Sequence, residues 1–287
     1  MILSRTARLG LAASFRPTLS ASSRIIAPLS RSYSSLPPEN IEQRSLVGKI
    51  LHGSPTAQAE SRQTHSAILA RGKYVHEIQK HRVKPECVEE YIALVSEHYP
   101  RIAEEGQGDV KLTGSWMTSV GDQDTALHIW EFTGYQGQAI AYDRLRRDPA
   151  YLEYQRRLRP LIRSRENQVC LEFAFWPTAP PRVTGGVYEL RTYDLKPGNM
   201  LEWETHWKKG LECKRPYCEP VGAWFAQLGN LNVVHHMWQY PDLATRKRTR
   251  EEAWQADGWP ETVYHTVRLA NRMKARILEP LPFSSLR

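Results

Sequence analysis

Residues 76–85 read HEIQKHRVKP, and residues 188–197 repeat this pattern 112 positions later as YELRTYDLKP. Two further blocks return at an offset of 108 positions: GSW at 114–116 becomes GAW at 222–224, and HIWEF at 128–132 becomes HMWQY at 236–240. Three blocks that return in the same order indicate an internal duplication. The sequence therefore predicts two copies of one domain, which we place at residues 73–180 and 181–287.

Each copy shows the same order of predicted elements. The opening block alternates like a strand, and the Lys-Pro pair that ends it favours the start of a helix. A hairpin of two strands follows, then a polar helical stretch, a helix that begins at a proline, and a closing strand. The later strands are expected at Val110–Val120, Ala126–Thr133 and Gln168–Trp176, and at Val221–Leu228, Asn232–Tyr240 and Ile277–Phe283. The later helices are expected at Tyr142–Arg147 and Leu243–Gln255, and from Pro149 and Pro260.

The element order β-α-β-β-α-β is the ferredoxin-like arrangement of the α+β class. Such a unit packs two helices on one face of a four-stranded sheet and leaves the other face bare. Two covalently linked copies can shield both bare faces by packing sheet against sheet. We therefore expect two tandem ferredoxin-like domains packed as a pseudo-twofold barrel, with the Pro/Gly-rich stretch Pro177–Gly186 as the linker.

The N-terminal segment has the composition of a mitochondrial presequence. Its first 38 residues contain five arginines, many serines and no acidic residue before Glu39. We expect a presequence over residues 1–33, with Arg31, Tyr33 and Ser34 forming the processing site. Residues 34–72 would form a flexible tether with one short helix at Glu42–Leu51. The predicted location is the mitochondrial matrix; the alternative is an N-terminus that is merely disordered.

Charge and composition exclude several classes of function. The five N-terminal arginines account for five of the eight net positive charges, so the remainder carries only +3. A general nucleic-acid surface is not expected for so small a charge. No apolar stretch reaches the roughly 18 residues of a transmembrane segment. The four cysteines, Cys87, Cys170, Cys213 and Cys218, form no CxxC pair, and we expect them to be reduced.

The first strands carry the most informative polar residues. We assign Tyr188, Leu190 and Thr192 to the face under the helices, and Glu189, Arg191 and Tyr193 to the barrel interior. The counterparts in the first copy are Glu77, Gln79 and His81. On the third strands one face holds His128, Trp130 and Phe132, matched by His236, Trp238 and Tyr240, but its direction is left open. The candidate pocket therefore comprises Glu77, His81, Glu189, Arg191, Tyr193, His128, Trp130, His236 and Trp238.

Two interpretations of these residues remain. They can line a pocket for a small planar or anionic ligand between the sheets. Alternatively, Glu189 and Arg191 pair with each other or with Glu77 and His81, while the tryptophans are core residues. The arginine-rich stretches Arg156–Arg165 and Arg246–Arg250 are interpreted as solvated helix faces, with an acidic partner as the alternative.

Motifs for known catalytic chemistry are missing from the sequence. It contains no HExxH, no phosphate-binding GxxxxGK[ST], no GxGxxG and no nucleophile elbow. His235 and His236 are adjacent on a strand and point to opposite faces, so they cannot hold one metal ion together. We therefore predict no catalytic residues, no metal and no cofactor.

Several motifs resemble those of one known family. YELRTY at 188–193 precedes LKPG at 195–198, VVHHMW occurs at 233–238, and SRENQ at 164–168 runs toward LEFAFW at 171–176. With AW at 253–254, GW at 258–259 and VY at 263–264, these closely resemble the NIPSNAP family, from about residue 73 to the C-terminus. The first copy departs from the pattern, because HEIQ at 76–79 replaces YELR.

The resemblance implies domains of the dimeric α/β-barrel type and an association with mitochondria. In animals it implies a link to the recruitment of autophagy machinery, or to vesicular transport. It brings no catalytic residues. The first hypothesis is therefore a non-catalytic mitochondrial matrix protein that acts through protein partners, in mitophagy-related quality control or trafficking. The alternative is a small-molecule-binding or monooxygenase-like barrel with a ligand between its sheets; either could form a homo-oligomer.

Overall fold

The computed structural model describes residues 73–287, which contain both repeats and belong to one compact unit. The expected presequence, its processing site at Arg31, Tyr33 and Ser34, the tether and the helix at Glu42–Leu51 lie outside the described residues. The first repeat contains β1 (Val75–Val83), α3 (Val88–Glu104), β2 (Val110–Val120), β3 (Thr125–Phe132), α4 (Gly134–Arg147), α5 (Pro149–Leu158) and β4 (Ile162–Glu172). The second contains β5 (Val187–Leu195), α6 (Met200–Lys214), β6 (Glu219–Leu228), β7 (Val233–Tyr240), α7 (Leu243–Ala253), α8 (Trp259–Val267) and β8 (Ala270–Pro280).

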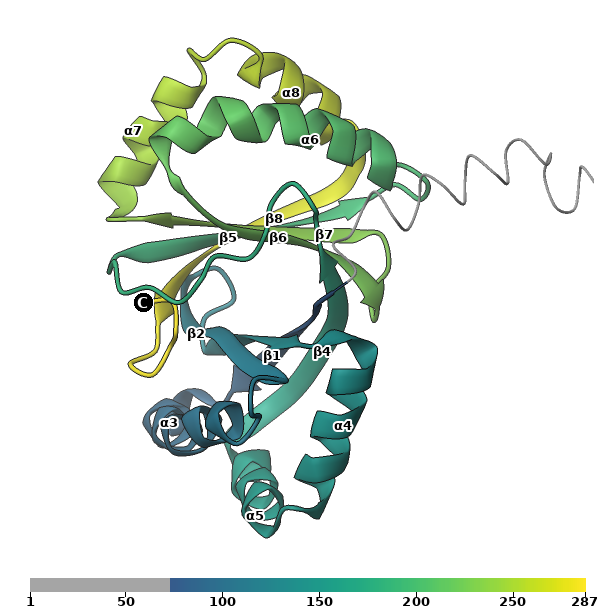
Figure 1. Cartoon of the computed structure of the whole chain (residues 1–287). Coiled ribbons are helices and arrows are strands. Elements are labelled where there is room, and N and C mark those ends of the chain that lie inside the picture. Colours follow the sequence, from purple (N-terminus) through teal and green to yellow (C-terminus); the bar gives the residue numbers. More distant parts are fainter. Residues whose placement is uncertain (1–72) are drawn as a thin grey trace, which may run out of the picture. The chain divides into compact units, whose positions relative to one another are not determined.

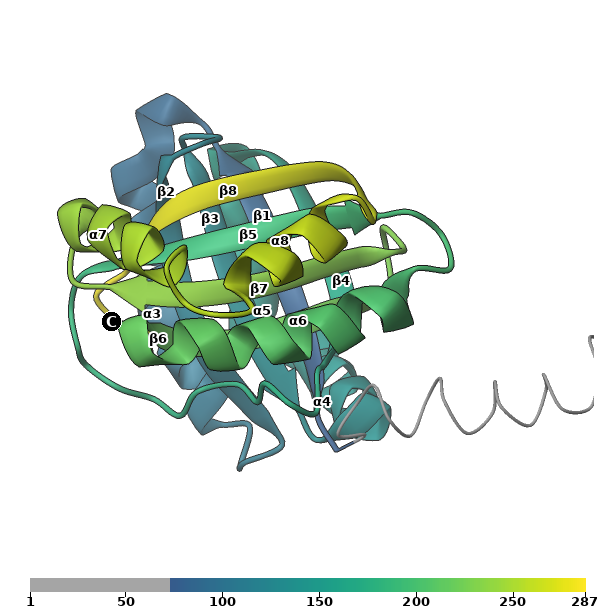
Figure 2. The same cartoon turned by 90° about the horizontal axis from the view of Figure 1, so that it is seen from above.

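The described strands form one closed antiparallel barrel. Each repeat contributes four neighbouring strands, in the orders β4-β1-β3-β2 and β8-β5-β7-β6, and the barrel closes through the pairs β2–β8 and β4–β6. Figure 1 shows the two sheets facing each other, with α3, α4 and α5 outside one and α6, α7 and α8 outside the other. Figure 2 shows the second repeat's helices lying across its sheet. This arrangement confirms the predicted pair of ferredoxin-like units packed as a barrel.

Three hydrophobic cores hold these layers together. The core under the first repeat's helices includes Tyr91 and Trp130, and the core under the second repeat's helices includes Trp203 and Trp238. The third core fills the space between the sheets and draws its buried members from the strands and the C-terminal segment, among them Ile78, Trp116, Tyr188, Leu190, Trp224 and Leu278. Every repeat therefore buries both faces of its sheet.

The predicted orientation of the first strands was wrong. Tyr188 and Leu190 belong to the core between the sheets, whereas Tyr193 packs with α6 residues in the core under the helices. Glu189 and Arg191 alternate with Tyr188 and therefore share the helix side with Tyr193. Strand alternation was assigned with the right period and the wrong phase, because both faces of these strands are buried and polarity alone does not separate them.

The closing segments of the two repeats are exchanged. After β4 ends at Glu172, the chain crosses to the second repeat, where the Phe173 amide donates to the Ala223 carbonyl at 3.0 Å. After β8, the Leu281 amide donates to the Ser115 carbonyl of the first repeat at 2.9 Å. Both contacts follow the 108-residue offset. Each repeat therefore completes the helix-side core of the other.

This exchange corrects the predicted closing strands. The first was expected to run through Trp176, but its last residues leave the sheet to pack under α6. The second was expected only from Ile277, but β8 begins at Ala270. Residues 270–276 are rich in exposed polar side chains and lacked the apolar alternation on which the prediction depended. The helix α4 also begins at Gly134, eight residues before the expected start.

Two glycines show how closely the repeats match in detail. A Cβ atom at Gly114 would lie 2.3 Å from Cη2 of Trp116, and one at Gly222 would lie 2.5 Å from Cζ2 of Trp224. Both tryptophans are fully buried between the sheets. A side chain at either glycine would collide with an indole ring that has no room to move.

In residues 73–287, none of the helices has the length and apolar character that a membrane-spanning helix needs.

Candidate functional site

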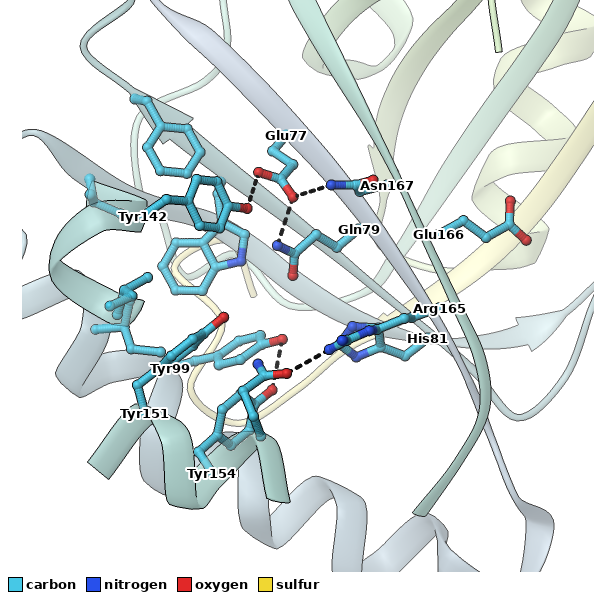
Figure 3. A pocket seen from close by; sticks show the side chains of 16 residues that line it. Glu77, Gln79, His81, Tyr99, Tyr142, Tyr151, Tyr154, Arg165, Glu166 and Asn167 are labelled. Carbon is cyan, nitrogen blue, oxygen red and sulfur yellow. Dashed lines mark hydrogen bonds between the residues drawn. The ribbon is translucent and has the colours of Figure 1, made fainter. Parts of the chain in front are cut away.

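A cavity of about 430 Å³ lies in the first repeat, between the sheet and its own helices (Figure 3). This volume falls within the range of small-molecule sites in proteins. Its apolar wall is largely aromatic, and its polar groups come from β1, β4 and α5. The aromatic lining residues are Tyr99, Trp130, Phe132, Tyr142, Tyr151 and Tyr154, and the main polar ones are Glu77, Gln79, His81, Gln155, Arg165 and Asn167.

Glu77 is a buried carboxylate that is surrounded by neutral hydrogen-bond donors. Its side chain is 1% exposed and accepts from Gln79 Nε2 at 3.0 Å and from Asn167 Nδ2 at 2.8 Å. Gln138 Nε2 donates at 3.1 Å, and the Tyr142 hydroxyl also donates to this carboxylate. No cation of residues 73–287 forms an ion pair with Glu77. The cavity wall therefore holds a fixed carboxylate that the protein does not neutralise with a cation.

The equivalent carboxylate of the second repeat is neutralised. Glu189 accepts from Arg191 Nη1 at 3.0 Å and from Arg246 Nη2 at 2.6 Å. Burial alone would raise the pKa of Glu189, but the Arg246 hydrogen bond and the charges of Arg191 and Lys214 lower that pKa to about 2. This group is therefore a structural ion-pair cluster, as one of the two interpretations of the sequence proposed.

A chain of hydrogen bonds runs from the cavity into the protein. His81 Nδ1 lies 2.8 Å from the Tyr91 hydroxyl, which lies 2.7 Å from His128 Nε2. His128 Nδ1 in turn lies 2.8 Å from Ser115 Oγ. All four residues are buried, and among them His81 lines the cavity. The cavity therefore connects to a continuous polar relay.

Both histidines of this relay are neutral at pH 7. Burial, with a smaller contribution from the Arg165 charge, lowers the pKa of His81 to about 4. Burial, aided by the charge of His81, also lowers the pKa of His128 well below its ordinary value. A neutral imidazole offers one donor and one acceptor, and hydroxyl groups rotate to suit either. The relay can therefore exist in two uncharged arrangements that differ in the direction of every hydrogen bond.

These two arrangements change what His81 presents to the cavity. If Tyr91 donates to His128, then His81 donates through Nδ1 and its Nε2 is an acceptor. If His128 donates to Tyr91, then Tyr91 donates to His81 and Nε2 carries the proton. Within residues 73–287 the Nε2 atom has no hydrogen-bond partner. His81 can therefore accept or donate a hydrogen bond to a ligand without acquiring charge.

The corresponding space in the second repeat is filled. Trp176 packs against Trp207 and Trp238, with ring centroids 6.3 and 4.5 Å apart, and only about 70 Å³ remains. Lys214 is 2% exposed, and its Nζ lies 4.0 Å from the Trp238 ring centroid. Burial lowers the pKa of this lysine to about 8. Tryptophans and a lysine thus replace the open volume of the first repeat.

The predicted pocket residues do not form one site between the sheets. Glu77, His81, His128 and Trp130 gather under the first repeat's helices. The second-repeat set, Glu189, Arg191, Tyr193, His236 and Trp238, gathers under the second repeat's helices. The prediction grouped the right residues within each repeat and wrongly merged the two groups. The sequence left open which way the face of β3 with His128 and the face of β7 with His236 point. In the structure both faces point to the helices.

Sequence reasoning missed the residues that α3, α4 and α5 add to the cavity. Tyr91 and Tyr99 lie on α3, and their hydroxyls make buried hydrogen bonds. Gln138 lies in the first half of α4, which was not predicted as helix, whereas Tyr142 is the first residue of the stretch that was predicted. A signal was present in part, because tyrosine at a core position of a helix brings a polar group that must find a partner.

No group of three or more His, Cys, Asp or Glu side chains within residues 73–287 is arranged to hold a metal ion. His235 and His236 point to opposite faces as predicted: His235 contacts Thr192 and Gln168 between the sheets, and His236 contacts Trp207 under the helices. Arg246 is not a purely solvated residue, since it binds Glu189. This corrects the interpretation of Arg246–Arg250 as a solvated face.

Comparison with known proteins agrees with this architecture. A family model described as NIPSNAP matches residues 76–177 and again residues 188–285. Protein NipSnap homolog 2 of Homo sapiens is 40% identical over 225 residues, which cover 77% of this chain and 79% of the relative. Protein NipSnap of Drosophila melanogaster is 34% identical over 262 residues, covering 88% and 92%.

Solved structures share the fold at much lower identity. A putative monooxygenase from Lactobacillus acidophilus superimposes with a TM-score of 0.55 at 11% identity, covering 72% of this chain and 94% of that chain. An anthrone oxidase-like protein superimposes with a TM-score of 0.50 at 12% identity, covering 76% and 96%. The two matched segments coincide with the two halves of the barrel, and the sequence relatives extend over most of the chain. The chain belongs to the NIPSNAP family.

Proposed function

We propose that the first repeat binds a small, neutral, largely aromatic molecule that carries a hydroxyl group. The observation that carries this proposal is the coincidence of an aromatic cavity with the unpartnered Nε2 atom of His81. Aromatic walls favour a flat apolar body through burial and ring contacts. The relay behind His81 lets its imidazole meet a hydroxyl as acceptor or donor. Glu77 and Arg165 bring one charge of each sign to the lining, which favours a neutral ligand over an ion.

The site also supports proton transfer to or from such a ligand. A neutral imidazole within hydrogen-bond reach of a hydroxyl can act as a general base, and the hydrogen bond between Nδ1 and Tyr91 holds the ring in place. Structures that share this fold include proteins described as a putative monooxygenase and an anthrone oxidase-like protein. These descriptions support the monooxygenase-like alternative as a class of chemistry. The helix-side cavity replaces the pocket between the sheets as its location.

Binding of three naphthalene probes to the full-length chain tests the proposal. We expect 2-naphthol to bind with one-to-one stoichiometry in isothermal titration calorimetry, naphthalene about fivefold more weakly, and 2-naphthoate most weakly. His81→Phe should abolish the preference for the hydroxyl, because it removes the Nε2 atom that would bind it. Tyr193→Phe, the second repeat's counterpart of the His81 position, should leave it unchanged. Equal affinity for 2-naphthol and naphthalene would exclude the role of His81.

We also propose that the chain acts in the mitochondrial matrix through protein partners, as its N-terminal composition suggests. The acid-free, arginine-containing segment over residues 1–33 supports this second proposal, and the family resemblance points to quality control or trafficking. A fusion of residues 1–72 to a fluorescent protein should enter mitochondria in cells. The same fusion with Arg5, Arg8 and Arg16 replaced by Asp should stay in the cytosol. Equal localisation of both fusions would refute the presequence.

A further inference from the structure

A second cavity, of about 270 Å³, opens between the two sheets at one end of the barrel. It exists because the edge strands pair over only part of their length. Residues 272–276 of β8 pair with β5 alone, and residues 164–168 of β4 pair with β1 alone. These halves of β4 and β8 have only one neighbouring strand each, and this leaves room between the sheets. This cavity shares Glu166 and Asn167 with the rim of the first and is otherwise lined by different residues.

Cations dominate the wall of this cavity. Five cationic side chains and two carboxylates line it: Lys80, Arg82, Arg272, Lys274 and Arg276, with Glu166 and Asp194. They converge from β1, β4, β5 and β8, so that positions distant in the sequence contribute to one space. Like charges that line a narrow space repel one another and raise the local concentration of anions. The balance of charge therefore favours an anionic occupant.

Part of this charge is neutralised by the protein itself. Lys80 Nζ lies 2.7 Å from Glu166, Arg272 Nη2 lies 2.6 Å from Asp194, and Arg276 pairs with Asp122 of the β2–β3 turn. Within residues 73–287, Arg82 and Lys274 form no ion pair. Two positive charges on β1 and β8 thus remain uncompensated at the cavity.

The buried floor of the cavity is uncharged: the apolar residues Ile78, Leu127, Leu190 and Val233 line it beside His235. His235 is 6% exposed, with Nδ1 3.0 Å from Thr192 Oγ1 and Nε2 2.6 Å from Gln168 Oε1. Burial and the Arg276 charge lower the pKa of His235 to about 4, so this floor adds no charge at pH 7. The charged side chains therefore lie at the mouth of the cavity, and the floor beneath them is neutral.

We propose that this inter-sheet cavity binds a small dianion, such as a phosphate or a dicarboxylate, between Arg82 and Lys274. Two uncompensated cations match a ligand with two negative charges, and guanidinium and ammonium groups form strong charge-assisted hydrogen bonds to such oxygens. The volume admits a small molecule and no folded partner. Apart from Glu166 and Asn167, this site shares no lining residue with the aromatic cavity.

Inorganic phosphate, succinate and acetate, each at matched ionic strength, serve as probes for the full-length chain. We expect phosphate, succinate or both to raise the melting temperature saturably, and acetate at the same concentration to have little effect. Phosphate binding without succinate binding would assign the site to phosphates, and the reverse would assign it to dicarboxylates. Failure of both dianions to bind would overturn the proposal.

The double variant Arg82→Ala/Lys274→Ala tests the assigned residues. Both side chains are exposed, and neither forms an ion pair in the described part of the chain, so their removal should not prevent folding. We expect at least about a tenfold loss of dianion affinity, because two charge-assisted contacts are lost. Lys209→Ala, which removes an exposed lysine from α6, is the matched control and should bind like the wild type. A circular dichroism spectrum and a cooperative thermal transition like those of the wild type would show that the double variant is folded. Wild-type dianion affinity in that folded variant would contradict the proposal.

Discussion

Gln138 and Arg246 stand 108 residues apart, and each donates a hydrogen bond to the buried glutamate of its own repeat. Gln138 Nε2 lies 3.1 Å from Glu77, and Arg246 Nη2 lies 2.6 Å from Glu189. The same exchange of amide for guanidinium separates Gln79 from Arg191. At both pairs of equivalent positions, the first repeat therefore has an amide where the second has a guanidinium. The second repeat neutralises its carboxylate and fills the surrounding space, while the first repeat keeps its carboxylate uncompensated beside an open cavity.

Gln138→Arg should convert the first repeat toward the second. The added guanidinium would pair with Glu77 and extend into the cavity rim, so we expect 2-naphthol affinity to fall by about tenfold. The free energy of unfolding should change by less than about 1 kcal/mol, because the new ion pair is only half-buried. Gln136→Arg, on the exposed face of the same helix, should affect neither quantity. Calorimetric titration measures the affinity, and chemical denaturation measures the stability. Unchanged 2-naphthol affinity would show that the surroundings of Glu77 do not affect ligand binding.

Glu189→Gln should destabilise the protein by about 2–3 kcal/mol, because two arginines lose a buried carboxylate partner. The folded pKa of about 2 lies below the ordinary value of 4.5. The stabilisation is therefore present above pH 4.5 and is lost as the pH falls from 4.5 toward 2. Urea denaturation at pH 7 and pH 3 should show the difference between wild type and variant shrinking at the lower pH. Glu219→Gln, which breaks an exposed pair with Arg182, should cost less than about 1 kcal/mol.

Glu204 on α6 should give the opposite pH dependence. Burial raises its pKa to about 7, above the ordinary 4.5, so the folded state favours the protonated carboxyl. Its contribution to stability is full below pH 4.5 and is lost as the pH rises through 7. Glu204→Gln should therefore match the wild type at pH 4.5 and exceed it by about 1–2 kcal/mol at pH 8.5. Glu202→Gln, on the exposed part of the same helix, should show no such gain in stability at high pH. The same pH dependence of stability in both variants would contradict the raised pKa of Glu204.

Trp176→Ala should open a cavity in the second repeat. This side chain is 1% exposed and fills the space beside Trp207 and Trp238. Its removal should cost about 3–5 kcal/mol. An apolar cavity of this kind can bind a matching aromatic molecule, so added indole should raise the melting temperature of the variant by several degrees and leave the wild type unchanged. Tyr217→Phe, at an exposed ring on the same repeat, is the control. A variant that indole does not stabilise would show that the repeat had collapsed instead.

The fold was largely predictable because the sequence contains two copies of the same domain. The repeated blocks fixed two copies, and the element order within each copy led to paired sheets that face each other. The exchange of closing segments could not be predicted, because Phe173 and Phe175 continue the apolar alternation of β4 after the strand has ended. The direction of Glu77 and Glu189 was missed for a related reason. Both faces of β1 and β5 are buried, so the alternation showed which residues share a face and left open what each face meets.

The site was predictable only in part. Strand positions such as Glu77, His81 and His128 were identified from their chemistry and their repeat. The helix positions that complete the cavity depend on how α3 and α4 cross the sheet, which spacing along the chain does not determine. The basic cavity between the sheets depends on where strand pairing stops. Arg82 and Lys274 lie 192 residues apart and are brought to one space by register alone.

A crystal structure of the full-length protein soaked with 2-naphthol provides the most direct test. We expect one naphthol molecule under the first repeat's helices, with its hydroxyl within hydrogen-bond distance of His81 Nε2, and none under the second repeat's helices. Naphthol bound elsewhere, or bound in that cavity with its hydroxyl turned away from His81, would contradict the proposed site.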